Sequence, residues 1–345
     1  MLDWQVSSPP LETGIAFATI PRNERAIYSE SMCKDEFGKC LLETCNDQPG
    51  KKRMTFVSVI IPAYNAASFV LGAINSVLGQ TFQNFELIVV DDGSKDGTRK
   101  TVESYLSDSR VRYLYQENRG LPGARNAGAK VSRGDYLAFL DADDFFAPNA
   151  LECMLNAFQS TDARWLNVGV LKLEGEIRTV RHPKTPEGDL LLAILEDDFI
   201  TRSPFYPRQE FFSVGMYDEE IRNREDWDIN IRMIGAGKRF VNVDQPLYYY
   251  TRTEGSITTG NRRRLYSFTE MLLRKHHKRL ADAGNKAAAH LYAQNLWRLA
   301  RGYFYEIRDP REGFRCAWQS LRYDPSLSRL VHPLFHRLQT ARNRR

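Results

Sequence analysis

The chain has 345 residues, 42% of them hydrophobic and 26% charged, and a formal net charge of +5. These values are typical of a globular protein of about two domains with enough apolar material for a sizeable core. No run of about 20 apolar residues occurs, which excludes a membrane-spanning helix, and no basic region precedes an N-terminal apolar run, so we expect a cytoplasmic protein without a secretory signal.

Residues 1–53 show no sustained hydrophobic period and end in a basic run directly before Met54. We expect a disordered tail here, or an artefact of an upstream start codon, and a folded domain that begins near Met54. The segment holds three cysteines, Cys33, Cys40 and Cys45, and no two of them have the tight spacing of a zinc site. All five cysteines of the chain are therefore expected to be free thiols.

From residue 57 onward, short apolar runs alternate with stretches of helical spacing. Buried strands are predicted at 57–61, 85–90, 111–115 and 136–140, and helices at 69–78, 98–106, 122–131 and 148–158. Because strands and helices alternate at short intervals, we expect an α/β fold with a mainly parallel sheet and helices on both of its faces.

Polar clusters follow three of these strands. Tyr64 and Asn65 come after the first strand, Asp91 and Asp92 after the second, and an Asp-x-Asp pair that starts at Asp141 after the fourth. Ligands of such sheets bind beyond the carboxyl ends of the strands, so separate segments bring polar groups to one edge. Asp91 and Asp92 have two compatible interpretations: they form a turn, and one carboxylate accepts a hydrogen bond from a nucleotide base or ribose.

Asp141 and Asp143 are the sharpest single feature of the sequence. Their carboxylates are hard oxygen ligands that suit Mg²⁺ or Mn²⁺, with waters and substrate phosphates completing the metal shell. Such a metal would neutralise the charge on a departing diphosphate. Asp-x-Asp is common in loops, so the interpretation depends on its position after a buried strand and opposite a second acidic strand end.

The second half of the chain is less regular. A hairpin is predicted over 165–173 and 176–180, a helix over 226–234, and strands at 240–243 and 247–251. Glu225 and Asp226 stand at the start of that helix. They either complement the helix dipole or supply a general base that takes the proton of an acceptor hydroxyl group, and the sequence leaves both open.

From Arg263 onward the chain is predicted to form helices separated by two Asp-Pro pairs. One helix carries an apolar stripe typical of helix packing, formed by Tyr292, Leu296, Leu299, Tyr303 and Ile307.

Positive charge is concentrated in this C-terminal part. Residues 261–345 carry 19 Lys or Arg against 6 Asp or Glu, whereas the rest of the chain carries 29 against 37. This asymmetry favours an acidic partner, namely an anionic membrane surface, a polyanionic acceptor or the acidic remainder of the chain, with solvated helix faces as an equal alternative. No nucleic-acid partner is expected, because the region lacks a recognised binding motif.

Taken together, the motifs of the first half resemble family 2 of the glycosyltransferases. The resemblance is strong over 54–160, weaker through Glu225-Asp226 and residues 255–258, and absent from 1–53 and the C-terminal helices. The motifs that carry it are Val57–Asn65, Gln80-Thr81-Phe82, Glu86–Ser94, Asp96-Gly97-Thr98, Asn118-Arg119-Gly120, Ala124-Arg125-Asn126 and Asp141–Asp144.

This resemblance implies a Rossmann-like fold of the GT-A type with a mixed sheet, and sugar transfer with inversion at the anomeric carbon. It implies a nucleotide-sugar site in which Asp92 contacts the base, Arg125 lies near the nucleotide or its phosphates, and Asp141 faces the ribose. The same site includes Pro62, Ala63, Tyr64 and Asn65.

The resemblance also assigns the reacting groups. Asp143 would hold Mn²⁺ or Mg²⁺, with Asp144 as a substitute. Asp226 would be the catalytic base, with Glu225 as the fallback.

We therefore expect a glycosyltransferase domain over 54–260, with nucleotide-sugar binding in 54–160 and the acceptor side in 161–260. The helical pattern and charge of 261–345 predict a basic helical extension after it. The Gln-x-x-Arg-Trp motif of processive relatives is absent, so we expect one sugar per encounter. The expected donor is a UDP-sugar, and the expected acceptor is a polysaccharide or lipid-linked glycan precursor at the inner face of a membrane. The sequence indicates neither the sugar nor the oligomeric state.

The sequence also bears on three other classes of protein. A nicotinamide-dependent dehydrogenase needs Gly-x-Gly-x-x-Gly where this chain has Pro62–Asn65, and no P-loop motif occurs. A non-catalytic nucleotide-sugar-binding or scaffold protein remains the alternative, which the intact acidic residues argue against.

Overall fold

The computed structural model describes residues 55–252 and 262–327. Its central sheet has the strand order β3-β2-β1-β4-β8. The first four strands in this sheet are parallel, and β8 is antiparallel to β4. The strands are β1 (Val57–Ala63), β2 (Phe85–Asp91), β3 (Val111–Tyr115), β4 (Tyr136–Phe139) and β8 (Phe205–Pro207). The mainly parallel sheet predicted from the alternation is confirmed, and β8 makes it mixed.

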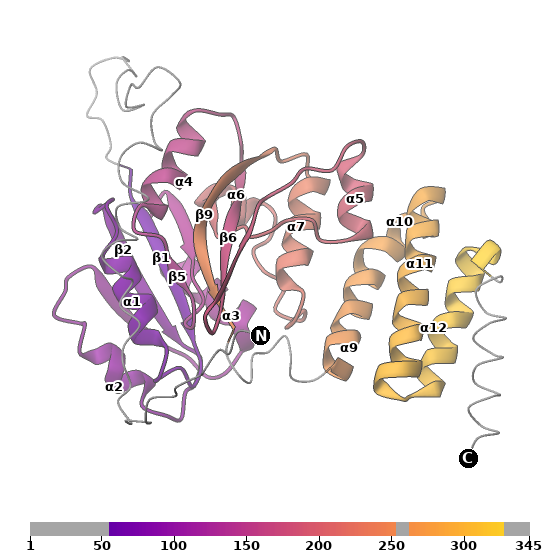
Figure 1. Ribbon diagram of the computed structural model, residues 1–345, viewed down its shortest axis with the longest axis horizontal. Helices are drawn as coiled ribbons and strands as arrows, with labels where there is room; N and C mark the ends of the chain where they lie inside the picture. The colour runs from indigo at the N-terminus through magenta and orange to yellow at the C-terminus, as the bar shows by residue number, and fades with distance from the viewer. Residues whose placement is uncertain (1–54, 253–261, 328–345) are drawn as a thin grey trace, which may run out of the picture. The chain divides into compact units, whose positions relative to one another are not determined.

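Helices follow the parallel strands, as Figure 1 shows. Every residue of β1 and β2 is buried, which explains why both read as continuous apolar runs rather than alternating ones. The helices of this half are α1 (Val70–Leu78), α2 (Thr98–Glu103), α3 (Gly120–Val131) and α4 (Ala150–Gln159).

Gly128 brings α3 close to β1. A Cβ atom at this position would lie 2.5 Å from Cγ2 of Ile60, so only glycine fits without a shift of the core. This approach fixes the distance between α3 and the sheet edge, and Arg125 lies one turn earlier on the same helix.

A second sheet has the order β5-β9-β6-β7, with β6 and β9 parallel and the other pairs antiparallel. The predicted hairpin is present as β6 (Trp165–Glu174) and β7 (Ile177–Arg181), and β5 spans Phe145–Phe146. The prediction of two strands at 240–243 and 247–251 was wrong, because a single strand, β9 (Phe240–Thr251), runs through Pro246. Register shifts on both sides of Gly169 absorb the extra residues.

Three helices lie in the segments that link strands of the two sheets: α5 (Leu190–Glu196), α6 (Arg208–Ser213) and α7 (Glu225–Gly235). Trp227 of α7 donates a hydrogen bond from Nε1 to the carbonyl of Ile194 in α5, at 2.7 Å. This bond joins α7, whose first turn holds the predicted base Asp226, to α5.

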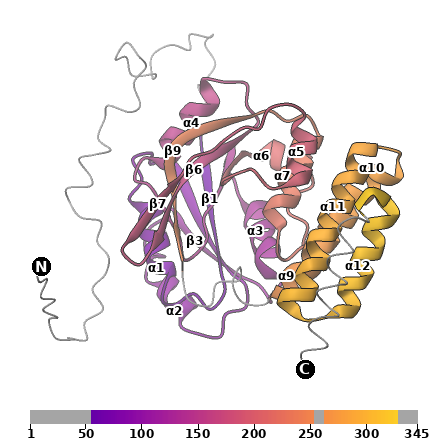
Figure 2. The same cartoon turned by 45° about the vertical axis from the view of Figure 1, so that its right-hand side comes forward.

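The C-terminal helices pack on one another and on α5, and Figure 2 shows α11 and α12 side by side. The predicted stripe is confirmed as packing, since Tyr292, Leu296, Leu299 and Tyr303 are buried and Ile307 packs against the same core. The elements are α9 (Arg262–Leu273), η2 (Arg274–Lys278), α10 (Arg279–Asp282), α11 (Lys286–Gly302), η3 (Tyr303–Ile307), α12 (Pro310–Tyr323) and η4 (Pro325–Leu327).

Some predictions lie outside the described residues, namely those on 1–53, on Cys33, Cys40 and Cys45, and on 255–258. Cys153 and Cys316 are buried thiols outside any disulfide bond, as expected. In the ranges 55–252 and 262–327, the structure contains no helix that is both long and apolar enough to cross a membrane. The domain boundaries at 54 and 260 stay predictions.

Candidate active site

The carboxyl ends of β2, β1 and β4 lie next to one another, because these strands are neighbours in the sheet and run parallel. The segments that leave these three strand ends contain most of the residues singled out in the sequence. They form two groups. One surrounds the end of β1, and the other surrounds Arg125 of α3.

In the first group, Pro62 and Ala63 end β1 and are buried, whereas the side chain of Tyr64 is 52% exposed. Asn65 has a positive φ of 49°. Its backbone N–H donates to Oγ of Ser94 at 2.9 Å, and its Oδ1 accepts from the N–H of Lys95 at 2.9 Å. The loops after β1 and β2 are therefore tied together, which holds the exposed ring of Tyr64 at the sheet edge.

Asp92 belongs to the same group, because its backbone N–H donates to the carbonyl of Ala63 at 2.8 Å. Its buried carboxylate accepts hydrogen bonds from the backbone N–H groups of Arg119 and Gly120, both at 2.8 Å, and from Nε2 of Gln116 at 2.6 Å. A carboxylate has about four acceptor positions. Asp92 thus fixes the start of α3 and keeps acceptor capacity for a ligand.

The second group is built on Arg125, which is only 1% exposed. Its Nη2 lies 2.7 Å from Oδ1 of Asp141, and its Nη1 lies 3.1 Å from Oε1 of Glu225 and 3.2 Å from Oδ1 of Asp226. The structure therefore brings together four of the predicted residues that are up to 101 positions apart in the sequence. The predicted contact between Arg125 and a phosphate stays a prediction.

Arg202, which sequence reasoning missed, closes this group from the other side. Its Nη2 lies 2.6 Å from Oδ2 of Asp141, and its Nη1 lies 3.2 Å from Oδ2 of Asp226. Two guanidinium groups and two carboxylates thus alternate in a closed ring. Planar guanidinium groups suit such bridging, because they present several donors in a rigid fork.

Tyr248 of β9 supports the ring. Its hydroxyl group accepts from Nη2 of Arg202 at 2.8 Å, and its aromatic ring lies 4.4 Å from the guanidinium carbon of Arg202. The same hydroxyl group donates to Oδ2 of Asp144 at 2.7 Å. Arg202 and Tyr248 had no local sequence signal, because the first lies in a loop before an edge strand and the second in a strand of the other sheet.

The electrostatics of Asp141 follow from this ring. Burial raises the pKa of the Asp141 carboxyl group, but the charges and hydrogen bonds of Arg125 and Arg202 hold it well below its usual range. Asp141 is therefore ionised at neutral pH.

Glu225 and Asp226 differ in their surroundings. The side chain of Glu225 is 9% exposed and that of Asp226 is 41% exposed. Burial and the neighbouring charge of Asp226 raise the pKa of Glu225 to about 7, against the opposing effect of Arg125. Of these two carboxylates, Asp226 is thus the more accessible to solvent and to an acceptor molecule.

Asp143 lies in the turn after β4 and is partly buried. Among the residues that the structure describes, no group of three or more His, Cys, Asp or Glu side chains is placed to hold a metal ion. Mg²⁺ and related ions are commonly bound by one or two carboxylates plus waters and phosphates, so Asp143 beside Asp141 fits a site of that kind.

Asp144 is a poor substitute for Asp143. It is 1% exposed, and its carboxylate accepts from the backbone N–H of Thr251 at 2.8 Å as well as from Tyr248. Burial and the charge of Asp141 raise the pKa of Asp144. Its contacts join β4 to β9 and point to a role in folding.

Comparison with solved structures identifies the fold. TarS residues 1–349 of S. aureus, solved in complex with UDP-GlcNAc, have a TM-score of 0.59 at 21% identity, over 78% of this chain and 81% of that one. The uncomplexed fragment has a TM-score of 0.58 at 22% identity, over 79% and 81% of the two chains. The fold is the mixed α/β fold of GT-A glycosyltransferases, with C-terminal helices.

Residues 58–217 match the family model described as Glycosyl transferase family 2. Residues 58–217 therefore form a glycosyl transferase family 2 domain, which confirms the resemblance found in the sequence.

Curated relatives extend this finding. "Uncharacterized glycosyltransferase EpsJ" of Bacillus subtilis (strain 168) is 31% identical over 215 residues, which cover 59% of this chain and 62% of the relative. Chondroitin synthase of Escherichia coli is 39% identical over 109 residues, or 31% of this chain and 16% of the synthase. The chain thus spans less than two thirds of the length of these relatives.

Proposed function

We propose that the chain is an inverting glycosyltransferase that moves a sugar from a nucleotide-diphosphate sugar to a hydroxyl group of an acceptor. The observation that carries this proposal is the placement of Asp226. Its carboxylate is 41% exposed and lies 3.2 Å from both Arg125 and Arg202, which also hold Asp141. General-base catalysis of sugar transfer requires a carboxylate that the acceptor hydroxyl group can reach, close to the bound donor.

The donor that we favour is a UDP-sugar, because TarS, which has the same fold, has been solved with UDP-GlcNAc. In this proposal the exposed ring of Tyr64 stacks on the nucleotide base, and Asp92 accepts a hydrogen bond from it. Asp141 accepts from the ribose hydroxyl groups. Pro62, Ala63 and Asn65 shape the backbone around the base.

Asp143 is the residue that we propose to hold Mn²⁺ or Mg²⁺. When bound there, the cation would offset the negative charge of the diphosphate. Asp141 lies two residues away, but both of its oxygens are already engaged by arginines. We place the cation on Asp143 because it lies in the turn directly after β4, two residues from Asp141.

In the proposed reaction Asp226 is the base. Its carboxylate takes the proton of the acceptor hydroxyl group, whose oxygen attacks the anomeric carbon from the face opposite the diphosphate. The new C–O bond forms while the bond to the diphosphate breaks, and the diphosphate leaves with the electron pair. Attack from the opposite face inverts the anomeric carbon. Arg125 and Arg202 hold the base in place, which removes part of the entropic cost of the transition state.

We propose a polysaccharide or lipid-linked glycan precursor as acceptor and one sugar per encounter. The basic C-terminal helices would let the enzyme work at the inner, anionic face of a membrane. Residues 54–160 would bind the donor, and 161–260 would face the acceptor.

Donor hydrolysis tests the function. The purified chain is incubated with a panel of nucleotide sugars in Mn²⁺ or in excess EDTA, and release of the nucleotide diphosphate is measured, with thermal shift as the binding readout. A bound donor at 100 times its dissociation constant stabilises by about 2.7 kcal/mol. Binding without hydrolysis or transfer would favour the non-catalytic alternative, and no stabilisation by any nucleotide sugar would contradict the proposal.

A further inference from the structure

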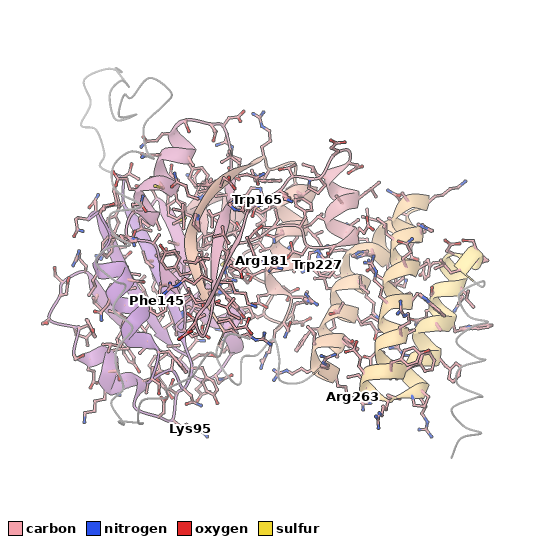
Figure 3. The ribbon with its side chains drawn as sticks, in the orientation of Figure 1. Lys95, Phe145, Trp165, Arg181, Trp227 and Arg263 are labelled. Atoms are coloured by element: carbon pink, nitrogen blue, oxygen red, sulfur yellow. The ribbon has the colours of Figure 1, made fainter. Side chains whose placement is uncertain are left out.

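A cavity of about 270 Å³ opens between the end of β7 and the segment that follows α5. Figure 3 labels Arg181, the last residue of β7, which lies near the centre of that view. One wall comes from β7 and the residues just after it, and the other from the segment between α5 and β8. The lining residues are Arg181, His182, Lys184, Asp198, Phe199, Ile200 and Thr201.

Two of the lining residues link this cavity to Asp226, the base of the proposed reaction. Asp198 accepts a hydrogen bond from Nδ2 of Asn230 at 3.1 Å, and Asn230 lies one helical turn after Asp226 in α7. On the other wall, Thr201 directly precedes Arg202, whose Nη1 lies 3.2 Å from Asp226. Two independent connections therefore join the lining of the cavity to Asp226.

The charge of the lining is mainly positive. Arg181 and Lys184 are exposed, and within 55–252 and 262–327 neither forms an ion pair. His182 is already engaged, because its Nδ1 lies 2.7 Å from Oδ1 of Asp244. Burial, together with the charge of Asp226, raises the pKa of Asp198 to about 7, so the one acidic group of the lining loses much of its charge near neutral pH.

The remaining lining is apolar. Phe199 is partly buried and Ile200 is 8% exposed, so they form a fixed surface rather than mobile side chains. A surface of this kind suits the carbon face of a sugar or polyol, with the two cations at its rim. The volume is enough for one charged group and the adjoining part of a sugar, but not for a longer glycan segment.

We propose that this cavity is an acceptor subsite that binds an anionic group, a phosphate or a carboxylate, carried by the acceptor close to the hydroxyl group that reacts. The inference rests on the proposed function and narrows its acceptor to glycans that carry a phosphate or a carboxylate. Arg181 and Lys184 supply the attraction, and the neighbouring Asp226 receives the hydroxyl proton. Because both cations are solvent-exposed, the attraction should weaken as the salt concentration rises.

Binding of small anionic sugars tests the proposal directly. The probes are glucose 6-phosphate and glucuronate, with glucose as the neutral comparison, titrated by NMR in saturating UDP and Mn²⁺ so that the donor site is filled. We expect both anionic sugars to bind at least tenfold more tightly than glucose, or one of them alone, which would identify the anion. The double variant Arg181→Gln/Lys184→Gln should lose this preference.

Arg178→Gln is the matched control, because Arg178 lies on the same strand but does not line the cavity. It should keep the preference for anions. Anionic sugars that bind no better than glucose, or equally well to the double variant, would overturn the proposal. Failure of UDP to bind would count against the proposed function alone, since the sugar titration can be run without it.

Discussion

The carboxylates of Glu225 and Asp226 share one helix turn and one arginine, yet they are suited to different tasks. Glu225 is buried against Arg125, which leaves little room for a substrate beside it. Asp226 is bridged by two arginines and still has a side chain that is 41% exposed. The residue pattern alone could not separate them, because both stand at the start of a helix where acidic residues are common; only the family resemblance put Asp226 first. Their exposure favours Asp226 as the base.

Replacing Asp226 by asparagine tests this assignment. The variant keeps the size of the side chain but cannot accept a proton, so kcat should fall by about 10²–10⁴-fold, the usual contribution of a general base. The dissociation constant for UDP, measured by calorimetry, should stay within about threefold, because Asp226 is not placed at the nucleotide. Glu225→Gln is the comparison, and a larger loss of kcat in that variant would transfer the role to Glu225.

Substitutions of Arg125 and Arg202 should affect stability and catalysis to different extents. Arg125 is 1% exposed and faces three carboxylates. Arg125→Met removes the arginine partner of buried Glu225 and one of the two arginines of Asp141 and Asp226, so it should cost about 3–5 kcal/mol in urea denaturation. The Arg202 side chain is 20% exposed. Arg202→Lys keeps the charge but not the fork, so it should lower kcat more than tenfold with a smaller loss of stability. An equal effect of both variants on stability and kcat would contradict this division.

At the scale of elements, strands and helices with strong local signals were predictable, and contacts between distant segments were not. Asp141 was expected at the sheet edge because β4 is a buried parallel strand, and the topology of such sheets is restricted. Arg202 was not expected, because its partners are 61 and 24 residues away in the sequence and its own segment has no regular period. The bulge in β9 was missed for the same reason, since it depends on the partner strand at Gly169.

The close packing of α3 on β1 can be tested at Gly128. In Gly128→Ala the added methyl group would lie 2.5 Å from Ile60 and 3.1 Å from Val90, both in the core. Overpacking of this kind costs about 1–3 kcal/mol, which should appear as a lower Tm. Gly235→Ala is the control, because a Cβ there meets only Leu191, at 3.9 Å. Its Tm should not fall, and equal destabilisation of both variants would show that packing on β1 is not the cause.

At the scale of the whole described chain, the C-terminal helices support α7, the helix whose first turn holds Asp226. Asp228 of α7 is fully buried and lies 2.7 Å from both Nζ of Lys275 and Nε2 of His276 in η2. Nearby, Nε2 of His277 and Nδ2 of Asn295 both lie within hydrogen-bond distance of the carbonyl of Leu195 in α5, at 2.6 and 3.1 Å. The extension therefore stabilises the surroundings of Asp226.

His277 makes this support sensitive to pH. The side chain is fully buried, and burial lowers its pKa from 6.5 to about 4, although the carbonyl of Leu195 opposes the shift. Because the folded pKa is lower than the unfolded one, the unfolded state binds more protons between these values. The contribution of neutral His277 to the free energy of unfolding is therefore fully present above about pH 6.5 and is lost as the pH falls through 4. The total loss is about 3 kcal/mol, at 1.36 kcal/mol per unit of pKa.

Urea denaturation at pH 7 and pH 5 measures this effect. His277→Gln removes the titrating group, so the difference in unfolding free energy between the two pH values should be smaller in the variant by about 2 kcal/mol. His290→Gln, at an exposed position of α11, serves as the control and should keep the wild-type difference. If His277→Gln also kept it, the imidazole would not be held neutral at the contact with α5, and the C-terminal helices would be attached mainly by the ion pairs of Lys275 and His276 to Asp228.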